Sequence, residues 1–182
     1  MTRVELARPF PQPGTEVRFY LDDLHRFAAI SSPSERELKL VETMPRPWDP
    51  ASCEPDFRRL LYKWLDEVVA WINEDHTWRV DRVVPGCWVE HPHIVNELAT
   101  VACVRWSAQF ATTAVPLADW YRFTLPVFLD RIAQQIGPKG CPPGRHQPHP
   151  GASRNDLYRD GVAQAERHRR QARDASAVQG SS

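Results

Sequence analysis

Apolar residues recur at three- and four-residue intervals over long stretches of this chain, and this spacing constrains its fold more than any other feature. The clearest stretch runs from Pro55 to about Glu74, and its apolar positions are Phe57, Leu60, Leu61, Trp64, Leu65, Val68, Val69, Trp71 and Ile72. Such spacing is typical of an amphipathic α-helix with one broad buried face. Asp56 lies in the expected first turn, where a carboxylate suits the helix dipole. A long helix is therefore predicted here.

Two further stretches with the same spacing predict a helical hairpin. The first runs from about Pro92 to Thr112, with a proline at the first helical position. The second runs from Leu117 to Ile136. Pro126 interrupts it and must remove one backbone hydrogen bond, so a kink or a junction of two helices is expected near Leu125. The predicted fold class is mainly α: a small helical bundle around this long hairpin, with at most one short strand.

The first fifty residues are predicted to form an N-terminal tail, two short helices and a proline-rich linker. Residues 1–14 hold prolines at 9, 11 and 13 and offer little to bury, which favours a flexible or extended tail. One helix is expected from about Thr15 to Ala28. A second is expected from about Ser34 to Thr43, because Ser34 and Glu37 have the spacing of a capping box. Three prolines within residues 45–50 mark the linker.

The rest of the chain divides at about residue 150. Residues 51–150 are predicted to form the compact helical domain. Within it, residues 77–84 alternate loosely and are rich in strand formers, which predicts an extended connector or one short strand. Residues 151–182 are predicted to form an Arg-rich, solvent-exposed helix followed by a disordered tail, because their apolar groups are few.

The charge balance and the cysteines limit the classes of function. Basic and acidic residues number 23 each, so the chain has no net positive charge that would attract nucleic acid or an anionic membrane. Any such binding would need a local cluster of basic residues. No apolar run approaches the roughly 20 residues that span a bilayer, and the N-terminus lacks a signal-peptide core. A cytoplasmic protein without a membrane partner is expected. Thiols stay reduced in the cytoplasm, so the four cysteines are expected to be core residues or metal ligands rather than disulfides.

Two loops carry the residues most suited to chemistry. The stretch 85–93 holds Cys87 and His91, and the Pro/Gly-rich segment after Gly137 holds Cys141 and His146. Zinc binds thiolate sulfur and imidazole nitrogen in a closed tetrahedron, so these four side chains form a candidate Cys₂His₂ site. The predicted hairpin begins at one loop and ends at the other, which would bring them together. A metal would also order the second loop, which has almost no apolar content.

Other interpretations of the same residues stay open. Cys87 could pack beside Trp88 while His91 caps the next helix, leaving Cys141 and His146 in a loose loop. His93 and His149 are substitute ligands. A catalytic zinc would need an open position and a nearby base, and Glu90 or Glu97 could serve in a metal-dependent hydrolase. Because no HExxH pattern is present, a structural zinc is favoured over a catalytic one.

The C-terminal arginines are the candidate nucleic-acid contacts. Arg167, Arg169, Arg170 and Arg173 lie close together on the predicted exposed helix, where they could bind phosphates. Nearby acidic residues offset most of their charge, which favours an ordinary solvated helix face. A DNA-binding regulator that uses this segment is therefore an alternative function.

Several of these residues also match a known pattern. The positions that match are Cys87, Trp88, His91, Pro92, Glu97, Leu98, Trp106, Trp120, Tyr121, Gly137, Pro138, Cys141 and His146. With these residues, the chain resembles an uncharacterised actinobacterial family, the domain of unknown function four-nine-one-three, over about residues 55–149. The sequence departs from the family at His93, where an acidic residue is common, and at Lys139, where an aromatic residue is common. Neither departure removes a candidate ligand.

The resemblance implies a genetic setting rather than a reaction. Genes of that family occur with conjugative plasmids, integrated elements and phages of actinobacteria. The expected function is therefore that of a non-enzymatic accessory protein of a mobile element, with a structural zinc, which binds a protein partner or DNA. The family has no known reaction to carry over.

Overall fold

The computed structural model describes residues 8–137, 141–142, 145–148 and 161. The chain divides into two compact units, Met1–Arg145 and His146–Ser182. All the helices below belong to the first unit, which therefore extends further toward the N-terminus than the expected start at residue 51. The predicted Arg-rich helix and its four candidate phosphate contacts, Arg167, Arg169, Arg170 and Arg173, lie outside the described residues.

The first unit is built from helices, which confirms the predicted mainly-α class. The α-helices are α1 (Thr15–Ala28), α2 (Glu35–Glu42), α3 (Pro55–Asp75), α4 (Pro92–Ala108), α5 (Val115–Asp119) and α6 (Leu125–Ile136). Three short 3₁₀ turns, η1 (Pro50–Ser52), η2 (Val80–Arg82) and η3 (Trp88–Glu90), lie in the connections. The described part of the chain holds no strand, and residues 77–84 form a connector containing η2.

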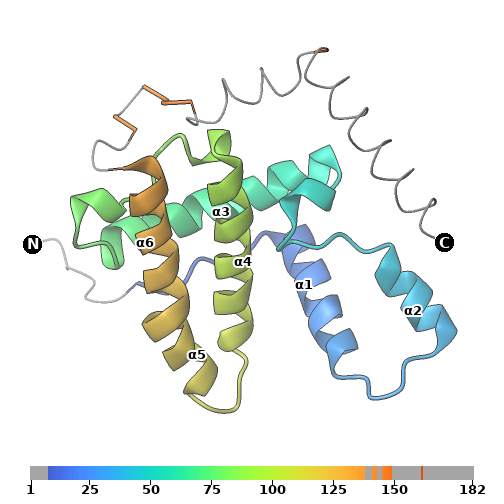
Figure 1. The fold of residues 1–182 in the computed structure, drawn as a ribbon. Helices are drawn as coiled ribbons and strands as arrows, with labels where there is room; N and C mark the ends of the chain where they lie inside the picture. Colours follow the sequence, from blue (N-terminus) through green and yellow to red (C-terminus); the bar gives the residue numbers. More distant parts are fainter. Residues whose placement is uncertain (1–7, 138–140, 143–144, 149–160, 162–182) are drawn as a thin grey trace, which may run out of the picture. The chain divides into compact units, whose positions relative to one another are not determined.

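Helices α4 and α6 form the predicted hairpin and lie side by side, with α3 crossing behind them (Figure 1). The chain returns through α5 and a π-helical turn, η4 (Trp120–Thr124), before α6 begins. This turn confirms the predicted irregularity near Leu125, since Pro126 cannot donate a hydrogen bond and its ring would crowd the carbonyl four residues earlier. Trp120 is fully buried there and donates its indole N–H to the Val101 carbonyl at 2.9 Å.

Residues 8–14 form an extended strap across α3, so the prediction that they offer little to bury was wrong. Phe10 is only 5% exposed, and its ring makes T-shaped contacts with Trp64 and Trp71 at centroid distances of 6.2 and 5.2 Å. Burial of an aromatic ring of this size is among the larger contributions one residue makes to a core. The first unit therefore includes this N-terminal segment in its core.

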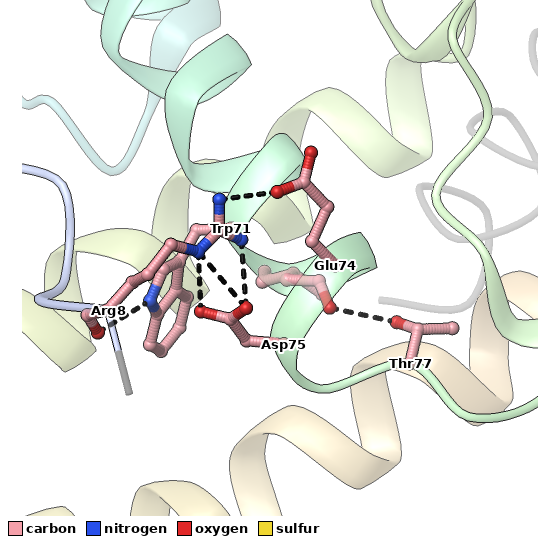
Figure 2. A network of polar contacts seen from close by, with 6 residues as sticks. Arg8, Trp71, Glu74, Asp75 and Thr77 are labelled. Carbon is pink, nitrogen blue, oxygen red and sulfur yellow. Dashed lines mark hydrogen bonds and ion pairs between the residues drawn. The ribbon is translucent and has the colours of Figure 1, made fainter. Parts of the chain in front are cut away.

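Polar contacts hold the strap at two further points. The indole N–H groups of Trp64 and Trp71 donate to the carbonyls of Pro11 and Arg8 at 3.0 and 3.2 Å. Figure 2 shows the Arg8 guanidinium turned toward the end of α3, where its Nε and Nη2 donate to the Asp75 carboxylate at 2.9–3.1 Å. These bonds fix the strap's register along α3.

Candidate metal centre

The loop that carries the first two candidate ligands is fixed to α3 before it reaches them. Val84 is 1% exposed, and its N–H donates to the Asn73 side-chain oxygen at 2.9 Å. The Asn73 amide in turn donates to the Val84 carbonyl at 2.9 Å. One side chain thus pairs both backbone groups of a buried residue, which would otherwise be costly to desolvate.

Trp88 is the second anchor of this loop. It is 2% exposed, and its indole N–H donates to the Asp66 carboxylate on α3 at 2.8 Å. Its ring packs edge-on against Tyr62 at 5.4 Å. Because Trp88 begins the η3 turn between Cys87 and His91, this packing holds both candidate ligands in place.

His91 ends η3 and is the N-cap residue of α4. Its N–H donates to the Trp88 carbonyl at 3.1 Å, and its own carbonyl accepts from the N–H of Ile94 at 2.9 Å. The imidazole does not cap the helix, in contrast to the alternative interpretation of the sequence. Although imidazole is polar, His91 is 4% exposed, and it is the one polar or charged side chain that is buried within the described residues.

Two thiols converge on one nitrogen of His91. The Cys87 Sγ lies 3.4 Å from Nε2, and the Cys141 Sγ lies 3.3 Å from the same atom. One lone pair or one hydrogen on Nε2 cannot serve both sulfur atoms with good geometry. In a tetrahedral zinc site, with Zn–S near 2.3 Å and Zn–N near 2.05 Å, sulfur and nitrogen ligands lie about 3.5 Å apart. The observed spacing matches that edge of the tetrahedron.

A fourth side chain completes a group that could hold a metal ion. Cys87, His91, Cys141 and His146 each offer one ligand atom, and these atoms all lie within 4.8 Å of one another. His91 is buried and the other three are half-buried. Of the two substitute ligands, His93 has its ring 5.7 Å from that of His91 but does not belong to the group, and His149 lies outside the described residues.

The thiol of Cys87 is held in its protonated form when no metal is bound. Burial raises its pKa, and the neighbouring Cys141 thiol raises it further. A metal binds thiolate rather than thiol, so binding must release a proton from each cysteine. Both thiols are free cysteines, and none of the four cysteines forms a disulfide.

The remaining candidate groups have other partners. Glu97 on α4 pairs with Arg131 on α6 at 3.2 Å, so one of the two bases considered for a catalytic zinc is committed to an ion pair. The other two cysteines are core residues, with Cys53 and Cys103 exposed by 3% and 5%. The Cys53 thiol donates to the Arg46 carbonyl at 3.4 Å. The Cys103 thiol has a strongly raised pKa because it is buried.

Fold and site together define a helical protein with a Cys₂His₂ group that could hold a metal ion. No model of a known protein family matches the chain, and neither curated proteins nor solved structures give a match. Among the described residues, no helix is long and apolar enough to cross a membrane.

Proposed function

We propose that this protein is a non-enzymatic, helical zinc-binding protein in which Cys87, His91, Cys141 and His146 hold one structural zinc ion. The observation that carries the proposal is the convergence of two thiols, at 3.4 and 3.3 Å, on one imidazole nitrogen that is buried. Two soft thiolates and two imidazoles are a ligand set that selects zinc over the harder calcium and magnesium ions.

A structural role is favoured over a catalytic one by the number of ligands. Catalytic zinc sites keep a position open for water, whereas four protein ligands close the coordination sphere. The zinc would link the segment after α6 to the corner between η3 and α4. Between α6 and His146 that segment holds three glycines and three prolines and has little apolar content, so metal binding would supply the stability that burial cannot.

We further propose that the protein is an accessory protein of an actinobacterial mobile element and acts in the cytoplasm by binding a protein partner or DNA. This part rests on the sequence resemblance described above. DNA binding would use the arginines between 154 and 173 and would weaken steeply with salt. A gel-shift titration at two salt concentrations, repeated after deletion of residues 154–182, separates the two modes, since a protein-binding module retards no DNA.

The zinc proposal is tested by the metal content of the purified protein. Native mass spectrometry and elemental analysis should find one zinc per chain in the wild type and much less in Cys87→Ser and Cys141→Ser. Cys53→Ser is the matched control, because its hydroxyl can still donate to the Arg46 carbonyl and the residue lies outside the metal group. Zinc that is absent from the wild type, or retained in both ligand variants, would contradict the proposal.

A further inference from the structure

A cavity of about 560 Å³ lies in the first unit, between α1, α4 and the start of α5. Its walls are largely apolar: Leu21 and Leu24 come from α1, Val104 and Phe110 from α4 and the turn after it, and Pro116 from α5. The cavity shares no residue with the metal group. A ligand in this cavity would therefore contact none of the candidate zinc ligands.

The size of the cavity favours a small molecule over a protein. Ligand pockets for small molecules have volumes of roughly 300–1,000 Å³, which includes this one. Thirteen residues line the cavity. A stable protein interface uses roughly 20–30 residues on each side, so this surface is too small to hold a second copy or another protein by itself.

The charge of the lining sets the charge of the occupant. None of the thirteen lining residues is Asp, Glu, Lys or Arg, and the titratable ones are His25 and Cys103. Burial raises the pKa of the Cys103 thiol and so keeps it neutral. The Thr100 hydroxyl is engaged with the Trp48 carbonyl at 3.3 Å. A charged group that entered between these apolar walls would lose its hydration without gaining an opposite charge, which is unfavourable.

We propose that this cavity binds an uncharged, mostly apolar small molecule. The α1 and α4 walls hold the apolar body of the ligand, and Trp48 lines the cavity beside them. The Thr100 hydroxyl donates to the Trp48 backbone carbonyl and so ties the backbone of that residue to α4. The site differs in chemistry from the metal centre, since it offers burial of apolar surface rather than coordination.

The test uses the full-length protein and the uncharged dye Nile red. Saturable binding with one dye per chain is expected for the wild type. Two substitutions fill the cavity from opposite walls, Ser107→Phe on α4 and Ala28→Phe on α1, and each should weaken dye binding at least tenfold. Both replaced residues are exposed, so the core need not rearrange. Asn96→Phe is the control, because Asn96 is exposed on α4 and does not line the cavity.

A pair of competitors tests the charge of the ligand. Decanol and decanoate share one chain length and differ in charge at neutral pH, so decanol should displace the dye at a concentration at least tenfold lower. The proposal is overturned if the wild type does not bind the dye saturably, if both filled variants bind it as the wild type does, or if decanoate competes equally well. Loss of binding in Asn96→Phe would also overturn it.

Discussion

The Cys141 thiol lies 3.3 Å from Nε2 of His91, although the two residues are 50 positions apart in the chain. The α4–α6 hairpin explains how they meet, since it begins just after His91 and ends shortly before Cys141. The contact brings a segment with little apolar content against the buried imidazole of His91. It is the relationship on which the zinc proposal depends.

Removal of zinc should lower thermal stability, because a metal that binds only the folded state stabilises it by mass action. At a free zinc concentration 100-fold above Kd, the stabilisation is about 2.7 kcal/mol. Differential scanning fluorimetry with and without a zinc chelator should therefore show a clear fall in Tm for the wild type. In Cys141→Ser the chelator should have little further effect. An equal fall in both proteins would mean that the chelator acts at another place.

Asn73→Ala should destabilise the first unit by about 2–4 kcal/mol, because it leaves both backbone groups of buried Val84 without their hydrogen bonds. Urea unfolding followed by circular dichroism measures the effect. The same variant should bind zinc more weakly, since the loop before Cys87 loses its attachment to α3. Asn96→Ala, at an exposed position of α4, should lose no stability. Equal stability of the two variants would contradict this account of the loop.

Phe10→Ala should destabilise the protein by about 3–5 kcal/mol, the usual cost of removing a buried aromatic ring. The N-terminal segment would then behave as part of the core rather than as a tail. Urea unfolding again gives the free energy. Gln12→Ala, on the same strap, is the control: it removes hydrogen bonds to the Phe10 carbonyl and to Gln109 but no apolar burial, so it should cost about 1 kcal/mol or less. If Phe10→Ala lowers the free energy of unfolding by less than about 1 kcal/mol, burial of the strap does not stabilise the fold.

The folded protein should lose stability at mildly acidic pH because of His76. Burial lowers the pKa of His76, whose ring centroid lies 4.1 Å from that of Trp71. The positive charges of Arg105 and Arg8 lower this pKa further, whereas the negative charge of Asp75 raises it in part. The unfolded chain then binds a proton more readily than the folded one. Stability contributed by neutral His76 is full above about pH 6.5 and is lost as pH falls from there toward the lower folded pKa.

The measurement compares urea unfolding at several pH values for the wild type and His76→Gln. The substitution should flatten the dependence on pH in that window. Identical slopes for the two proteins would contradict the lowered pKa of His76.

The helices follow directly from local patterns in the sequence. The spacing of apolar residues predicted α3 and α4 to within a few residues, and Ser34 with Glu37 predicted α2 through a capping box that the structure confirms. Pro126 predicted the irregular turn before α6. Each of these signals acts over a few neighbouring residues, so sequence alone can reveal it.

Contacts between distant residues were harder to predict. Phe10 looked like part of a tail because its partners, Trp64 and Trp71, lie on a helix more than fifty residues away. The supports of the metal group were missed for the same reason: nothing near Asn73 or Asp66 marks them as partners of Val84 and Trp88. The four candidate ligands could be named because their residue types suit one ion and because the predicted hairpin brings their two loops together.

The most direct test of the zinc site is X-ray absorption at the zinc edge of protein loaded with one equivalent of zinc. The proposed site should show two sulfur ligands at about 2.3 Å and two imidazole nitrogens at about 2.0–2.1 Å. Cys141→Ser should lose one of the two sulfurs. A zinc ion coordinated only by nitrogen and oxygen, or one with a single sulfur in the wild type, would contradict the convergence of Cys87 and Cys141 on His91.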